Sequence, residues 1–210
     1  MIDFKKEHLF EFETHPFGGH LNELTRTLVI GTFPSHAKNA DLRFFYGGKD
    51  NRFWTLLAII YDEQFKRTTG DAAVRERRVL LDKYHIGITD MIASCYRYDG
   101  RSGDEHLFPV ELNDILTILD RYPAINRLVF TSRTFAIGAL GLFRTYLRAK
   151  GHILEELDRD GEFLLKRHFL YSERSVSIQV PFSPSKRVEA EGRADLDDMI
   201  LMYRQAFRGE

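Results

Sequence analysis

Short continuous runs of apolar residues alternate along this chain with segments in which apolar residues recur every three or four positions. The runs at 27–31 and 127–131 have continuously apolar centres, which is typical of strands covered on both faces. A third run, 175–180, alternates and is closed by Pro181, and it predicts another strand. Two short runs around Asp160-Gly161 predict a hairpin, because an Asp-Gly pair favours a tight turn.

The spacing of apolar residues also predicts several helices. In the segments 112–119 and 196–207 these residues lie three and four positions apart, and Asp195 is expected to cap the second segment. Further helices are predicted at 54–61, 74–84 and 133–148. Helices that alternate with buried strands predict an α/β fold, namely a three-layer αβα sandwich around a mostly parallel central sheet of about four strands. Because no repeat or linker interrupts the pattern, we expect residues 1–210 to form a single domain.

The loops after the first and the last predicted strand carry residues that suit ligand binding. In a sheet of this kind, ligands bind at the carboxyl ends of the strands. Gly31-Thr-Phe-Pro-Ser35 ends the first strand with a turn at which the backbone can approach a ligand. After the last strand, two hydroxyls framed by prolines can donate to a phosphate, and two cations add positive charge. The predicted phosphate-binding residues are Ser183, Ser185, Lys186 and Arg187.

A third segment, Phe44-Phe-Tyr-Gly-Gly-Lys-Asp-Asn-Arg-Phe-Trp54, combines aromatic rings with a glycine pair and an amide. Flat rings and an amide suit the recognition of a nucleobase. Tyr46 and Asn51 are the predicted exposed members, whereas Phe53 and Trp54 are assigned to the core. The pattern of a nucleotide-binding P-loop is absent, because position 43 is not a glycine and position 50 carries no hydroxyl.

Composition limits the classes of function. Thirty basic and 31 acidic side chains leave a net charge of -1, which excludes a histone-like positive surface but allows a local basic face. The single cysteine excludes an intrachain disulfide and an all-cysteine cluster. The eight histidines show no metal-ligand spacing, so we expect neither a metal nor another cofactor. No apolar run approaches about 18 residues and no signal peptide is recognised, so we expect a soluble cytoplasmic protein without membrane contacts.

Three of these segments, in this order, resemble motifs of the uracil-DNA glycosylase superfamily. Residues 31–35 look like its first motif, Asn51-Arg-Phe-Trp54 looks like the segment shared by its mismatch-specific and hypoxanthine-specific branches, and Ser183-Pro-Ser185 is similar to its final loop motif. Three further segments also fit: His15-Pro16-Phe17, 86–90 and 127–132. The resemblance covers roughly residues 15–207, is closest to the hypoxanthine-DNA glycosylase branch, and implies a uracil-DNA glycosylase-like fold.

The resemblance implies a monofunctional DNA glycosylase that excises a deaminated base from double-stranded DNA, with hypoxanthine preferred and uracil as the alternative. Many members carry a catalytic Asp or Asn two residues after the first-motif glycine, and here that position is Phe33, which cannot position water. The hypoxanthine-specific branch has its catalytic asparagine before the Phe-Trp pair, which assigns catalysis to Asn51. Tyr46 falls where the family has the aromatic residue that stacks on the flipped base, with Phe33 as a second ring. Gly48 and Lys49 stand where that branch commonly has His-Pro, so the substrate is free to differ.

We expect a monomer that becomes nucleoid-associated when it binds DNA. Two other classes of function stay open, namely a DNA-binding module that has lost catalysis and a hydrolase of small nucleosides. Asp90 is interpreted as a cap or salt-bridge residue, and no pattern separates Asp104 or Asn113 from surface residues. If Asn51 is dispensable for activity, Asp90 and Asp104 are the next candidates.

Overall fold

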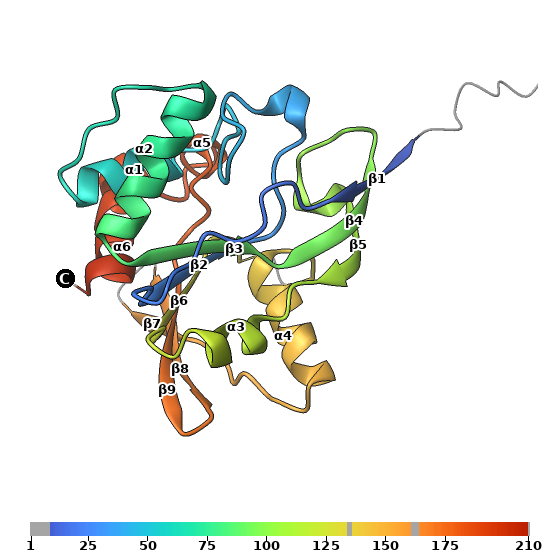
Figure 1. Cartoon of the computed structure of the whole chain (residues 1–210), viewed down its shortest axis with the longest axis vertical. Coiled ribbons are helices and arrows are strands. Elements are labelled where there is room, and N and C mark those ends of the chain that lie inside the picture. The colour runs from blue at the N-terminus through green and yellow to red at the C-terminus, as the bar shows by residue number, and fades with distance from the viewer. Residues whose placement is uncertain (1–8, 134–135, 161–163, 210) are drawn as a thin grey trace, which may run out of the picture.

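The computed structural model describes residues 9–133, 136–160 and 164–209, and it contains two β-sheets, the larger of which is packed between helices (Figure 1). The larger sheet has the strand order β3-β2-β6-β9-β8-β7. In that order its strands span Ile86–Asp90, Thr27–Gly31, Arg127–Phe130, Arg174–Val180, Leu164–Tyr171 and Asp158–Asp160. β3, β2, β6 and β9 run parallel to one another, while β8 and β7 form an antiparallel edge.

The mostly parallel sheet is confirmed, and the three strands expected from apolar runs are β2, β6 and β9. The sheet is larger than the four strands expected, because β8 and β7 extend it beyond β9. Every residue of β2 is buried, whereas β8 contains several exposed residues and therefore lacks a continuous apolar run. The expected turn at Asp160-Gly161 includes Gly161, which lies outside the described residues; β7 and β8 on either side of it do pair antiparallel.

Helices cover both faces of the larger sheet and give three layers (Figure 1). The helices are α1 (Phe53–Ile60), α2 (Gly70–Lys83), α3 (Ile115–Arg121), α4 (Ala139–Ala149), α5 (Lys186–Ala190) and α6 (Leu196–Arg208), with short 3-10 turns η2 (Ala37–Asn39) and η3 (Asp104–His106). Val29 packs in one core with α1, α2 and α6, and Leu28 and Ile30 pack in a second core with α3 and α4. Successive strand residues point to opposite faces, so each continuous apolar run supplies both cores.

The sequence pattern does not reveal a second sheet, which is three-stranded and antiparallel. Its strands β1 (Phe10–Thr14), β4 (Ile92–Tyr98) and β5 (Leu107–Leu112) lie in the order β1-β4-β5. Only Met91 separates β3 from β4, so the chain passes directly from the large sheet into the small one (Figure 1). The segment between β4 and β5 then carries Asp104 to the carboxyl end of the large sheet.

The structure corrects two predicted helix starts. Leu112 ends β5 and does not begin a helix; α3 starts later because the side chain of Asp114 accepts a backbone N–H at 3.0 Å as its cap. α4 starts at Ala139 instead of position 133, and residues 134–135 lie outside the described part of the chain. Asp195 caps α6 as expected, within a capping box. In the described ranges, none of the helices combines the length and the apolar character needed to cross a bilayer.

Candidate functional site

A cavity of about 610 Å³ opens at the carboxyl ends of the parallel strands. The residues at the ends of β2, β3, β6 and β9 all contribute to its wall, among them Gly31, Asp90, Thr131 and Ser183. The loops after Gly31 and after Val180, where a ligand is expected from the fold class, therefore meet at one place. A cavity of this volume accommodates a small organic molecule.

The loop before α1 and the loop after β9 are joined by backbone hydrogen bonds beside this cavity. Asn51 and Ser185 form an isolated antiparallel bridge, and Lys186 N donates to Asp50 O at 2.9 Å. These residues belong to two of the segments that carry the family resemblance. Although they are far apart in the sequence, they form one continuous wall.

Asn51 lies in that wall, and the two ends of its amide have different environments. Its Oδ1 accepts the backbone N–H of Phe53, the first residue of α1, at 2.9 Å. Its Nδ2 has no hydrogen-bond partner among the residues that the structure describes. The carbonyl therefore holds the side chain in place, and the NH₂ group can donate to a ligand.

Tyr46 packs against the core with one ring face and also lines the cavity. Its ring stacks on Phe53 with centroids 4.1 Å apart, and its Oη lies 2.8 Å from Thr131 Oγ1. Burial, followed by the negative charge of Asp90, holds the pKa of Tyr46 well above its usual value, so the phenol stays neutral. Tyr46 is thus half-buried rather than exposed, and Phe53 covers one face of its ring. Phe53 itself is fully buried, as expected.

Phe33 forms a fixed apolar part of the wall. The His15 ring meets it edge-on with centroids 5.5 Å apart, and the guanidinium carbon of Arg97 lies 5.5 Å from its centroid. Phe33 lines both the main cavity and a second cavity of about 490 Å³. Its ring offers a contact surface to a ligand and no hydrogen-bonding group.

Asp90 is a buried carboxylate of the main cavity that the sequence interpretation left outside the site. Its Oδ2 lies 2.9 Å from His15 Nε2, so His15 is the side-chain partner of this carboxylate. Because the N–H of Phe17 donates to His15 Nδ1, the Nε2 nitrogen is the one that donates to Asp90. A side chain at Gly31 would overlap Asp90 Oδ1, which shows how closely this carboxylate approaches the first motif. The position of Asp90 at the end of a fully buried strand is the signal that points to the site.

Asp104 reaches the same cavity from η3. Its Oδ2 accepts the hydroxyl of Thr32 at 2.9 Å and that of Ser132 at 3.1 Å. Burial raises the pKa of Asp104 to about 6, and the two hydroxyls oppose this shift only in part. No sequence pattern marks this residue, because it lies between two strands of the small sheet.

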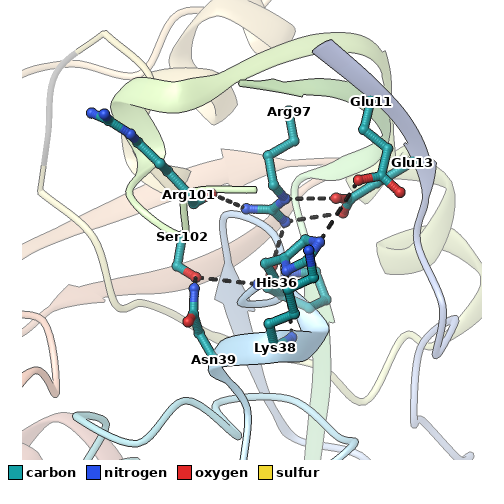
Figure 2. A network of polar contacts seen from close by, with 9 residues as sticks. Glu11, Glu13, His36, Lys38, Asn39, Arg97, Arg101 and Ser102 are labelled. Atoms are coloured by element: carbon teal, nitrogen blue, oxygen red, sulfur yellow. Dashed lines mark hydrogen bonds and ion pairs between the residues drawn. The ribbon is translucent and has the colours of Figure 1, made fainter. Parts of the chain in front are cut away.

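A buried arginine holds the loops that carry Phe33 and Asp104 (Figure 2). Arg97 is 0% exposed, and its Nε and Nη2 donate to the two carboxylate oxygens of Glu13 at 2.7 and 3.1 Å. It also donates to Pro34 O at 2.8 Å and to Arg101 O at 2.7 Å. One guanidinium therefore connects β1 with the first-motif loop and with the loop before η3.

The same network contains a group of potential metal ligands. Glu11, Glu13 and His36 each offer one ligand atom within 4.8 Å of the others, and this is the only such group found among the described residues. Both Glu13 oxygens already accept from Arg97, and His36 Nδ1 accepts the N–H of Lys38. The group is an ion-pair network around a guanidinium (Figure 2), and we assign no metal to it.

The predicted phosphate-binding residues lie at or beside the mouth of the cavity. Ser183, Ser185 and Arg187 line it, and Lys186 begins the adjacent helix α5. Ser185 Oγ caps that helix by accepting the N–H of Arg187 at 3.2 Å, so its hydroxyl can still donate. Arg187 Nε lies 2.6 Å from a carboxylate oxygen of Glu191, so this cation already has a partner.

Two further arginines add positive charge to the wall. The guanidinium carbons of Arg133 and Arg193 lie 4.0 and 5.7 Å from the ring centroid of Phe182. Burial lowers the pKa of Arg133 to about 10, so it keeps its charge near neutral pH.

Comparison of the chain with protein-family models and with curated proteins finds no match in either case.

Proposed function

We propose that this chain is a monofunctional DNA glycosylase with a uracil-DNA glycosylase-like fold, which removes a deaminated base, hypoxanthine in preference to uracil. The observation that carries the proposal is that Tyr46 and Asn51, whose Nδ2 has no hydrogen-bond partner among the described residues, line one cavity at the carboxyl end of the sheet. The three segments that resemble the superfamily motifs all line that cavity, which supports the proposal.

The roles of these residues follow from the charge that develops as the N-glycosidic bond breaks. Positive charge grows on the sugar and negative charge on the departing base. Because stacking hides this bond in a duplex, the nucleotide must first rotate out into the cavity. Tyr46, with Phe33 as a second ring, then contacts the base, and Asn51 Nδ2 donates to it as its negative charge grows. Asp90 supplies negative charge near the sugar, and water completes the hydrolysis.

A hydrolase of small nucleosides is the second candidate, because cations at the mouth are paired with carboxylates. Arg187 and Arg193, which line the cavity, both pair with Glu191. The phosphates of DNA must compete with these carboxylates for the arginines, whereas an uncharged nucleoside does not need the arginines. DNA glycosylase is the first candidate because Ser183 and Ser185 add hydroxyl donors at the same mouth.

An abasic-site assay separates the candidates. The protein is incubated with duplexes that contain one deoxyinosine or one deoxyuridine, and in parallel with free inosine. The proposal predicts alkali-labile sites in the deoxyinosine duplex, fewer in the deoxyuridine duplex, and no hydrolysis of free inosine. Hydrolysis of free inosine alone would identify a nucleoside hydrolase, and DNA binding without excision would identify a non-catalytic module.

We expect Tyr46→Ala to weaken the binding of a deoxyinosine duplex about tenfold, because one base–aromatic stack contributes about 1–3 kcal/mol. Tyr46→Phe is the matched control, since it keeps the ring on Phe53 and loses only the hydroxyl contact with Thr131. Fluorescence anisotropy measures both affinities, and urea unfolding measures stability. If Tyr46→Ala is less stable than the wild type but binds the duplex with the same affinity, the ring of Tyr46 contributes only to core packing.

Binding should also depend on salt, despite the net charge of the chain. Neutralising about two phosphates predicts an affinity loss of about tenfold for a fourfold rise in salt concentration. Arg187→Gln should reduce the slope of log affinity against log salt by about one. Arg148→Gln, which removes an exposed cation on α4, is the control and should leave the slope unchanged. A flat salt dependence would argue against phosphate contacts at the mouth.

A further inference from the structure

Asp104 is held so that its two carboxyl oxygens have different roles. Oδ2 accepts the hydroxyls of Thr32 and Ser132. Oδ1 has no hydrogen-bond partner within the described ranges, and the residue lines the main cavity. A proton on this carboxyl therefore resides on Oδ1, the oxygen that a ligand can reach.

The groups around Asp104 favour its protonated form. Burial is the largest cause and raises its pKa to about 6, and the charges of Asp90 and Glu105 act in the same direction. Tyr46 lines the same cavity as Asp104, and its phenol is neutral. Arg133, the cation of this part of the wall, donates to the carbonyls of Val180 and Pro181 at the end of β9. Asp90, in contrast, accepts from His15, so the cavity holds two carboxyls in unlike surroundings.

We propose that Asp104 is the general acid of base excision, and this inference rests on the proposed function. As the bond between C1′ and the base nitrogen breaks, its electron pair moves onto the base. Asp104 Oδ1 gives its proton to another ring nitrogen, so the base leaves as a neutral molecule. Water adds to C1′ and releases a proton, which returns to the Asp104 carboxylate through solvent. One water is consumed, and the products are the free base and an abasic sugar.

This role selects a purine over a pyrimidine. Hypoxanthine in DNA retains ring nitrogens with lone pairs that can accept a proton while another nitrogen holds the sugar. In uracil one ring nitrogen holds the sugar and the other already carries hydrogen, so neither accepts a proton readily. A general acid at this position therefore favours excision of hypoxanthine.

Single-turnover excision of deoxyinosine from a duplex, followed as a function of pH, tests the proposal. The wild-type rate should be highest below a pH of about 6 and fall about tenfold per unit above it, because only the protonated carboxyl acts. Asp104→Asn keeps an oxygen for the two hydroxyls but has no acidic proton. We expect it to be about 10²-fold slower near pH 6 and insensitive to pH, so that the two rates converge at about pH 8.

Two more variants distinguish chemistry from a structural role. Ser132→Ala removes a hydroxyl that lowers the pKa of Asp104, so the fall in rate should move to higher pH. Glu105→Gln removes a neighbouring carboxylate that raises the same pKa. The excision rate of this variant should still fall as the pH rises, and the fall should occur at slightly lower pH. A purely structural role for Asp104 changes the rate without moving the pH at which it falls.

A pH-independent wild-type rate, or an Asp104→Asn rate equal to the wild-type rate near pH 6, would overturn the inference and leave the glycosylase function intact. No excision by the wild type at any pH would overturn the proposed function itself. If Asp104→Asn does not fold, the wild-type pH profile and its shift in Ser132→Ala still decide the question.

Discussion

Asn51→Asp is expected to lose about 10²–10³-fold in the single-turnover rate of base excision, because removing one preorganised donor typically has an effect of this size. The substituted carboxylate keeps an oxygen that can accept the N–H of Phe53, so this hydrogen bond at the start of α1 is retained. It lacks the Nδ2 donor and repels negative charge that grows on the base. Quenched-flow or manual single-turnover assays with the deoxyinosine duplex measure the loss.

Asn51→Ala separates the structural hydrogen bond of Asn51 from its proposed chemistry. This variant should lose activity to a similar extent and also about 1 kcal/mol of folding free energy, because it removes the acceptor of the Phe53 N–H. Urea unfolding should therefore distinguish the alanine variant from the aspartate variant, while their excision rates stay alike. Wild-type activity in either variant would remove Asn51 from the catalytic site.

Arg97→Met is expected to lower the free energy of unfolding by about 3 kcal/mol, which is typical when one partner of a buried ion pair is removed. The substitution leaves the Glu13 carboxylate without its guanidinium and the carbonyls of Pro34 and Arg101 without donors. Equilibrium unfolding in urea measures the change. The loops that carry Phe33 and Asp104 should loosen together, so excision should fall as well.

Two control variants test whether the ion pair is the cause. Glu11→Gln changes an exposed glutamate at the edge of the same network and should alter stability by less than about 1 kcal/mol. Combining Glu13→Gln with Arg97→Met should restore part of the lost stability, because the unpaired carboxylate disappears. If the double variant loses the sum of the two single effects, Arg97 stabilises the fold by packing alone.

The sequence predicts those strands whose apolar residues form a clear run. The centres of β2 and β6 are short apolar runs that identify them, and Asp195 marks the start of α6 by its capping chemistry. β3 is equally buried, but Gly87 and Thr89 interrupt its apolar residues, so no run predicts it. β8 is partly exposed, and the Asp-Gly pair before it indicates this strand more clearly than its own pattern does. The sequence does not predict the small sheet either, because none of the residues of its edge strand β1 is fully buried.

The candidate site could be predicted only where its residues lie in contiguous motifs. Asn51 and Ser185 are recognised separately by local chemistry, and the structure joins them in one bridge. Asp104 reaches the cavity from the segment between β4 and β5, and a sequence pattern carries no information about such a long-range contact. The hydrogen bond from the Phe53 N–H to Asn51 is likewise visible only in the geometry at the start of α1.

The most direct test of the account is to identify the released base by mass spectrometry, with the protein in excess over a deoxyinosine duplex. Wild-type protein and Asn51→Asp, purified in parallel, are compared at a pH near 6. The account predicts one free hypoxanthine for each abasic strand with the wild type and almost none with Asn51→Asp. No hypoxanthine from the wild type, or equal release by both proteins, would contradict it.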